Sequence, residues 1–449
     1  MTILPVSLAD VVRARGVISD LTLLTPVLHS PELSQRSGLE VHLKMENLQR
    51  SGSFKIRGAL AKIQSLSPAE RVRGVIAASA GNHAQGVALG AARAGIPSTI
   101  VMPERAPLTK VTATRNYGAE VVLHGQTYDD AYRKARELQG QTGATFVHAF
   151  DDPGTIAGQG TIGLEILEQL SEVDTVVVPI GGGGLISGVA VAIKEQRPQA
   201  RIIGVQAAGA PAAYLRLKKG YAAELEAVRT IADGIAVRRA GDLTSEIMAR
   251  YVDEIVLVGE EEIAQAILLL LDRTKTQAEG AGAVGVAALL AGKIGGSSGA
   301  AVHPGALESQ AVAGTSGLSV TPVTPGPPGT NSGKRPTAAV IVSGGNIDPN
   351  LLVRIIERGL VRSGRFARLA TVVPDRPGEL QKILGVVSAA GANVLSVHHD
   401  RWAPGTSVEE AEVRLTIETR DPDHLEDLIG ALRAEGYSAK PVDKSRERL

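Results

Sequence analysis

A lysine between two apolar residues is the first feature of this sequence that could carry out chemistry. Lys55 follows a short Ser/Gly turn and lies between Phe54 and Ile56. Burial in apolar surroundings disfavours the ammonium form of a lysine and lowers its pKa. The neutral amine can then attack a carbonyl group and form a Schiff base. Taken alone, the pattern also fits a surface lysine that opens a helix.

A run of four glycines forms a second candidate site: Gly181, Gly182, Gly183 and Gly184. The run separates a strand-like stretch, residues 175–180, from a helix-like stretch, residues 185–195. Backbone N–H groups without neighbouring Cβ atoms can converge on an anion, and the N-terminus of the following helix adds a favourable dipole. A phosphate group is the natural ligand, although a tight turn without a ligand has the same sequence. A nucleotide-driven enzyme is disfavoured because the sequence has no P-loop motif.

Two further motifs complete a pattern. Residues 79–83 read Ser-Ala-Gly-Asn-His, and residues 343–346 read Ser-Gly-Gly-Asn after an apolar run. The lysine, the asparagine loop, the glycine run and the late Ser-Gly-Gly-Asn, in this order, resemble the pyridoxal-phosphate enzymes of fold type II, the tryptophan-synthase-β type. The residues within the motifs are most similar to those of the threonine dehydratases (threonine ammonia-lyases). The resemblance covers about residues 5–365.

The resemblance implies a role for each motif. Lys55 would bind the cofactor, pyridoxal 5'-phosphate, and return protons to the substrate. Asn82 would bond the ring hydroxyl, Ser343 would face the pyridine nitrogen, and the glycine run would hold the phosphate. Phe54 would pack near the ring, or it fills the core. The substrate carboxylate would bind the asparagine loop, which comprises Ser79, Ala80, Gly81, Asn82 and His83. For His83 we expect a structural hydrogen bond rather than the role of a base.

Ser343 also bears on the expected reaction. A hydroxyl cannot keep the pyridine nitrogen protonated as a carboxylate would, so the ring is a weaker electron sink. Loss of a β leaving group as the α proton departs is then favoured over a long-lived carbanion. The resemblance therefore implies conversion of L-threonine to 2-oxobutanoate and ammonia, with L-serine as a slower substrate.

Some positions separate this chain from its relatives. Ala80 stands where similar serine racemases have a serine base, and Gln206 stands where they have a glutamate metal ligand. We therefore expect no divalent metal site, while a monovalent cation held by carbonyl groups stays open. Glu279 fits either a position near the cofactor or a helix N-terminal carboxylate. An L-serine dehydratase or racemase is the alternative of the same class, and a non-catalytic amino-acid sensor is the alternative of a different class.

Alternating strands and helices must position these motifs. Short apolar runs alternate with helix-like runs, which predicts an α/β fold with open parallel sheets covered by helices on both faces. The expected strands are residues 41–45, 74–78, 98–102, 120–123, 146–148, 175–180, 201–206 and 338–342. Ligands in such sheets bind beyond the carboxyl ends of the strands. We expect a catalytic domain over residues 1–364, with a small subdomain at about 46–150.

Residues 295–334 interrupt this pattern. Gly, Pro, Ser and Thr dominate the segment, and no apolar period is visible. Such a composition cannot bury enough surface to offset its ordering entropy, so we expect a disordered insertion. The alternative, a linker between domains, would place the motif at residues 343–346 outside the enzyme.

The carboxy-terminal part, residues 366–449, predicts a separate domain. The expected order of elements is βαββαβ, which is that of a ferredoxin-like sandwich. An Asp-Arg-Pro-Gly turn at residues 375–378 and the Gly-Ala-Asn-Val at 391–394 resemble an ACT domain, a regulatory module that binds amino acids. The resemblance implies an amino-acid effector, such as isoleucine or valine, and a homodimer or homotetramer.

Composition excludes several classes of protein. The 449 residues include 47 basic and 47 acidic side chains, so nothing indicates a nucleic-acid or anionic membrane partner. The absence of cysteine excludes disulfides and thiolate chemistry. The chain starts without a signal-peptide pattern and has no apolar run of about 18 residues, as a membrane span needs. We therefore expect a cytoplasmic protein.

Overall fold

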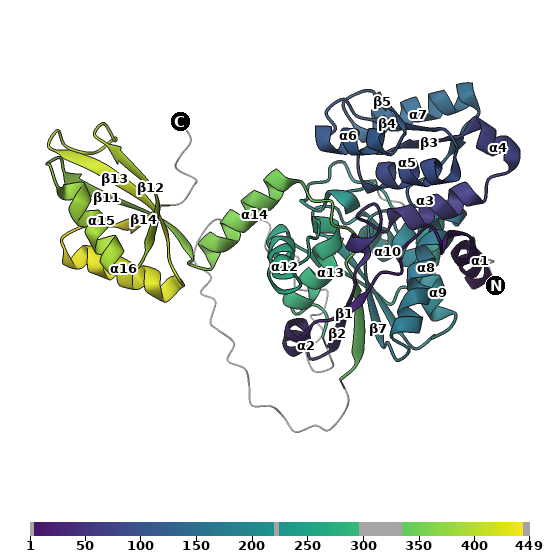
Figure 1. Ribbon diagram of the computed structural model, residues 1–449. Coiled ribbons are helices and arrows are strands. Elements are labelled where there is room, and N and C mark those ends of the chain that lie inside the picture. Colours follow the sequence, from purple (N-terminus) through teal and green to yellow (C-terminus); the bar gives the residue numbers. More distant parts are fainter. Residues whose placement is uncertain (1–3, 220–223, 296–334, 443–449) are drawn as a thin grey trace. The chain divides into compact units, whose positions relative to one another are not determined.

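The computed structural model describes residues 4–219, 224–295 and 335–442 (Figure 1). Contacts divide the chain into two compact units, Met1–Asn346 and Ile347–Leu449. The expected insertion at 295–334 lies outside the described residues, except for residue 295. Within the described ranges, no helix combines the length and apolar character that a membrane span requires.

A six-stranded sheet forms the centre of the first unit. Its order is β1-β2-β10-β7-β8-β9, and every neighbouring pair is parallel except β1 with β2. The strands are β1 (Val27–His29), β2 (Glu40–Lys44), β7 (Thr175–Pro179), β8 (Arg201–Ala207), β9 (Glu254–Val258) and β10 (Thr337–Ile341). All residues of β7 and β10 are buried, as expected where helices cover both faces.

A second, four-stranded parallel sheet lies within the expected small subdomain. Its order is β5-β4-β3-β6, with β3 at Val75–Ala78, β4 at Ser98–Met102, β5 at Glu120–Leu123 and β6 at Thr145–Phe146. Alternate residues of its central strands pack against α5 (Asn82–Ala94) on one face and α7 (Tyr128–Thr142) on the other. The predicted α/β architecture is thereby confirmed.

The remaining helices of the first unit surround the two sheets (Figure 1). They are α1 (Leu8–Ile18), α2 (Pro31–Ser37), α3 (Lys55–Gln64), α4 (Pro68–Arg73), α6 (Leu108–Asn116), α8 (Pro153–Gln169), α9 (Gly184–Lys194), α10 (Ala212–Lys219), α11 (Asp242–Tyr251), α12 (Glu260–Arg273) and α13 (Gly280–Leu290), together with the short η1 (Glu46–Leu48) and η2 (Asp233–Ile235). The sequence analysis did not predict β1, β9, α2, α4, α10 or α11.

The helix α8 corrects one sequence prediction. The sequence pattern predicts a helix only over residues 160–170, and the three glycines at 154, 158 and 160 lower the helix propensity of the stretch before it. The helix begins instead at Pro153, where the Asp152 side chain accepts a hydrogen bond from Thr155 N at 3.0 Å. The glycines serve close packing, since a Cβ on Gly158 would lie 2.5 Å from the Arg57 carbonyl oxygen on α3. Tertiary packing therefore overrides propensity here.

The second unit has the predicted ferredoxin-like order. It runs β11 (Phe366–Pro374), α15 (Glu379–Ala389), β12 (Asn393–Asp400), β13 (Glu410–Glu418), α16 (Pro422–Ala434) and β14 (Lys440–Pro441). The antiparallel sheet has the order β12-β13-β11-β14. Buried side chains of β11 and β13, among them Leu369 and Leu415, pack with Leu428 and Leu432 of α16 to form its core.

The helix α14 (Pro349–Arg362) falls in this second unit. The sequence analysis placed residues 348–362 at the end of the catalytic domain. The contacts divide the chain after Asn346 instead, because α14 packs against β11.

Candidate active site

Lys55 lies at the start of α3, and its side chain is half-buried. Its Nζ donates a hydrogen bond to the Ala149 carbonyl oxygen at 3.1 Å. Burial lowers the pKa of Lys55 from 10.5 to about 8, against an opposing effect of the Glu279 charge. A substantial fraction of this amine is therefore neutral near physiological pH, as a nucleophilic lysine requires.

Phe54 packs against the core, which is one of the two interpretations offered by the sequence. Its ring centroid lies 5.2 Å from Lys55 Nζ, and the ring also packs against the core beneath the six-stranded sheet. Its backbone N–H donates to the Ser343 carbonyl oxygen at 3.1 Å, and Ser53 forms a β-bridge with Gly344. The first and last of the four motifs therefore lie side by side.

The glycine run connects β7 to α9 and is closely packed. Gly183 caps the helix with a φ of 99°, a left-handed conformation that favours glycine. A Cβ on Gly182 would lie 2.4 Å from the Phe150 ring, and the Gly182 carbonyl oxygen accepts a hydrogen bond from Thr244 Oγ1 at 2.7 Å. The first turn of α9 presents backbone N–H groups that have no partner within the helix, which suits an anion.

The asparagine loop meets α13 and the late motif through side-chain amides. Asn82 Nδ2 donates to Glu279 Oε1 at 2.6 Å, and Asn346 Nδ2 donates to Asn82 Oδ1 at 2.8 Å. Glu279 caps α13, and its backbone N–H donates to the Gly344 carbonyl oxygen at 3.0 Å. Burial raises the pKa of Glu279 from 4.5 to about 7, and Asp233 adds to this effect. Of its two expected positions, the structure shows Glu279 at the N-terminus of a helix, α13.

The rest of the asparagine loop presents backbone donors. Ser79 Oγ accepts a hydrogen bond from Gly81 N at 3.1 Å, and α5 starts directly afterwards without a side-chain cap. Its first-turn N–H groups suit a carboxylate. Ala80 is half-buried and packs against the core of the small sheet.

His83 is held in the interior. Its Nε2 lies 2.8 Å from the Val147 carbonyl oxygen, to which the neutral ring donates a hydrogen bond. Burial, together with the charge of Lys55, lowers the pKa of His83 from 6.5 to about 3. A ring that stays neutral in this way has a structural role and does not act as a base near neutral pH.

Ser343 lies just beyond β10 and is 2% exposed, and its Oγ donates to the Ala281 carbonyl oxygen at 3.3 Å.

Gln206 is fully buried, and its Oε1 accepts a hydrogen bond from Tyr214 N at 2.9 Å. Among the described residues, no group of three or more His, Cys, Asp or Glu side chains could hold a metal ion.

Three contributors to this site were missed or left unassigned by the sequence analysis. Asn346 belongs to the Ser-Gly-Gly-Asn motif at residues 343–346, so its side-chain amide could have been named as a candidate site group from the sequence. The Ala149 carbonyl group and the Phe150 ring follow the last strand of the small sheet and carry no distinctive motif.

Comparison with known proteins identifies the class of this chain. The chain belongs to the pyridoxal-phosphate dependent enzymes, whose family model matches residues 18–305. An L-threonine ammonia-lyase of Thermotoga maritima is 50% identical over 437 residues, which cover 97% of this chain and 100% of that protein.

Solved structures similar to this chain include a threonine deaminase and a serine racemase. The processed form of threonine deaminase isoform 2 from Solanum lycopersicum has 36% identity and a TM-score of 0.67, covering 78% of this chain and 86% of that one. Maize serine racemase has 32% identity and a TM-score of 0.67, covering 80% of this chain and 99% of that one.

The residues present fit pyridoxal phosphate. The aldehyde requires a lysine with a lowered pKa, which Lys55 supplies. The phosphate requires backbone donors at a helix N-terminus, which the glycine run before α9 supplies. The buried hydroxyl of Ser343 would face the pyridine nitrogen.

Proposed function

We propose that this chain is an L-threonine ammonia-lyase that forms 2-oxobutanoate and ammonia and acts more slowly on L-serine. The observation that carries the proposal is the Lys55 amine at the start of α3, whose pKa burial lowers to about 8, beside Phe54, whose N–H bonds the Ser343 carbonyl oxygen. The similarity to the Thermotoga enzyme along the whole of that protein supports it.

When bound, pyridoxal phosphate supplies an electron sink for the bond that breaks at the substrate Cα. The chain's own residues position the substrate and move protons around that atom. Lys55 Nζ would remove the α proton and return one later, while the Ala149 carbonyl oxygen orients the amine. The N–H groups at the start of α5 would hold the substrate carboxylate, and Asn82, fixed by Glu279 and Asn346, would bond the ring hydroxyl.

Ser343 would favour elimination over racemisation in this scheme. A neutral hydroxyl at the pyridine nitrogen limits the charge that the ring can accept, so the β-hydroxyl must leave as the proton departs. Ala80 offers no hydroxyl that could deliver a proton to the opposite face of Cα. We therefore expect little D-serine.

Substrate turnover tests this proposal. Purified protein with pyridoxal phosphate is mixed with L-threonine or L-serine, and 2-oxo acid, ammonia and D-serine are measured. The Lys55→Ala variant is the control and should form no product. Appreciable D-serine would favour a racemase. Cofactor binding without turnover of either substrate would exclude the dehydratase, and the absence of cofactor binding would favour the amino-acid sensor.

We further propose that residues 366–449, within the second unit, form an ACT domain that binds an amino-acid effector, with isoleucine and valine as first candidates. Its βαββαβ order supports this assignment. We also propose a cytoplasmic homodimer or homotetramer. Threonine turnover with and without each amino acid tests the effector, and light scattering of the eluting protein tests the assembly. A monomer whose turnover is indifferent to both would contradict these proposals.

A further inference from the structure

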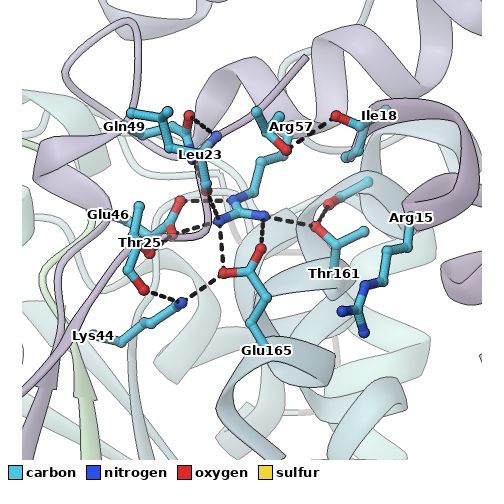
Figure 2. A network of polar contacts seen from close by, with 12 residues as sticks. Arg15, Ile18, Leu23, Thr25, Lys44, Glu46, Gln49, Arg57, Thr161 and Glu165 are labelled. Carbon is cyan, nitrogen blue, oxygen red and sulfur yellow. Dashed lines mark hydrogen bonds and ion pairs between the residues drawn. The ribbon is translucent and has the colours of Figure 1, made fainter. Parts of the chain in front are cut away.

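Four buried charged side chains form a cluster at the start of α3 (Figure 2). Its members come from β2, η1, α3 and α8, and their exposed fractions are 0% for Lys44, 0% for Glu46, 1% for Arg57 and 6% for Glu165. Two positive charges face two negative charges. None of the four is among the residues expected to bind the cofactor or the substrate, although Arg57 follows Lys55 by two positions; we refer to them as the rear cluster.

Arg57 is the centre of the rear cluster. Its Nε and Nη2 donate to the two carboxylate oxygens of Glu46, both at 2.8 Å. Its Nη1 and Nη2 donate to the two oxygens of Glu165, at 2.6 and 3.0 Å. Both pairs are bidentate, which fixes the plane of the guanidinium as well as its position. The two carboxylates raise the pKa of Arg57 against the opposing effect of burial, so the group stays charged.

Lys44 extends the cluster on the far side of Glu165. Its Nζ donates to Glu165 Oε2 at 2.5 Å, to the Thr25 carbonyl oxygen at 2.8 Å and to Gln169 Oε1 at 2.8 Å. All three ammonium donors therefore have acceptors. Burial nevertheless lowers the pKa of Lys44, because the attraction of Glu165 offsets only part of the lost hydration.

Stability alone is a weak explanation for this arrangement. Replacing a buried ion-pair cluster with apolar residues of similar volume is often neutral or stabilising, because four charges must lose their hydration. What the cluster does provide is a fixed geometry. Two bidentate pairs hold one turn of α3 against η1 on one side and against α8 on the other.

That turn of α3 is the one that carries Lys55. Arg57 N donates to the Phe54 carbonyl oxygen at 3.0 Å, and Phe54 N donates to the Ser343 carbonyl oxygen at 3.1 Å. Residues two apart on a helix project about 200° apart around its axis, so Arg57 and Lys55 point in nearly opposite directions. The rear cluster therefore resists rotation of α3, and such rotation would swing Lys55 Nζ.

We propose that Arg57 is a positioning residue that, through Glu46 and Glu165, fixes the Lys55 amine relative to the bound cofactor. The inference rests on the proposed function of Lys55. A helix rotation of about 7° would move an atom some 8 Å from the axis by about 1 Å, and misplacement of that size can cost about 100-fold in rate. The rear cluster thus sets the rate of the lysine's reactions without touching substrate or cofactor.

Two variants on the same helix test the proposal. Arg57→Lys keeps the charge and loses the bidentate geometry. Lys62→Met is the control: it removes another ion pair between α3 and the start of α8, Lys62 to Asp152 at 2.7 Å, about two helical turns beyond Lys55. Each apoprotein is mixed with pyridoxal phosphate, and the rate of cofactor capture is followed by absorbance and by borohydride trapping at Lys55. Thermal unfolding and the kcat and KM for L-threonine are measured alongside.

We expect Arg57→Lys to capture the cofactor about 10-fold more slowly and to lose about 10- to 100-fold in kcat with little change in KM. Lys62→Met breaks a partly exposed ion pair, so it should cost less stability and should change either rate less than about 2-fold. Equal rates in Arg57→Lys and wild type would overturn the proposal, as would equal losses in both variants.

Two safeguards keep the test decisive. If Arg57→Lys does not fold, Glu165→Gln takes its place, because it keeps the shape of the side chain and weakens one bidentate pair; wild-type rates in that variant would equally overturn the proposal. Cofactor capture is measured without substrate. A wild-type protein that captures the cofactor but does not deaminate threonine would refute the proposed function, while the capture rates would still decide the role of Arg57.

Discussion

The lowered pKa of Lys55 predicts how the apoprotein captures its cofactor as pH changes. With a pKa of about 8 instead of 10.5, the neutral amine makes up about 10% of the population at pH 7 instead of about 0.03%, roughly a 300-fold difference. Only the neutral amine attacks the aldehyde. The rate should rise about 10-fold per pH unit below pH 8 and level off above it.

Stopped-flow absorbance measures this rate between pH 6 and pH 10.5. The signal is the band near 410–420 nm, roughly where the cofactor bound to a lysine absorbs. An α-blocked lysine in the same buffers is the matched control, because dividing by its rate removes the cofactor's own ionisations. A corrected rate that keeps rising with unit slope beyond pH 10 would show an ordinary lysine and refute the reasoning.

The Glu279→Gln variant gives an independent check on the cause. The charge of Glu279 raises the pKa of Lys55, whereas burial lowers it. Removal of that charge should therefore shift the break in the profile to lower pH. A shift to higher pH would contradict the assigned electrostatics.

Three further predictions concern stability and metal dependence. Gly182→Ala should cost about 1–3 kcal/mol and weaken cofactor binding, because its Cβ would lie 2.4 Å from the Phe150 ring; Gly140→Ala, whose Cβ meets nothing within 4 Å, should not destabilise. Thermal unfolding with and without pyridoxal phosphate compares the two. The folded pKa of Glu279 is raised from 4.5 to about 7, so the folded state binds the extra proton in that window. Relative to Glu279→Gln, the free energy of unfolding of the wild type should therefore fall between pH 4.5 and pH 7 in urea titrations. Dialysis against a chelator should leave threonine turnover unchanged, since the described residues offer no cluster of metal ligands.

Most of the fold follows from local pattern. The strands at 98–102 and 120–123 were predicted to the residue, because short apolar runs end sharply at turn residues. The ferredoxin-like unit followed from the order of its elements. The edge strand β9 (Glu254–Val258) was missed, although its Ile-Val-Leu-Val run before Gly259 is the same kind of signal.

Part of the candidate site could also be predicted from the sequence. The glycine run and Ser343 follow the neighbouring strands β7 and β10, so the topology of the sheet predicts that they lie at the same edge. Lys55 follows no strand directly, because η1 lies between β2 and α3, and its place was predicted from its motif alone. The hydrogen bond from Lys55 to the Ala149 carbonyl oxygen could not be predicted from the sequence, because every residue has a backbone carbonyl group. The ion pair of Arg57 with Glu165 joins side chains 108 residues apart, and neither position shows a pattern that pairs it with the other.

The position of β10 has a consequence for how the chain assembles. This strand lies between β2 and β7 and pairs in parallel with both, although it follows them by more than 150 residues. On the ribosome, the two neighbouring strands emerge long before it, and their facing edges stay unpaired until it arrives. A single cut between residues 296 and 334 would also leave two fragments joined by a strand inserted in the middle of a sheet. Such fragments should therefore remain associated, and when made separately they should reconstitute the enzyme.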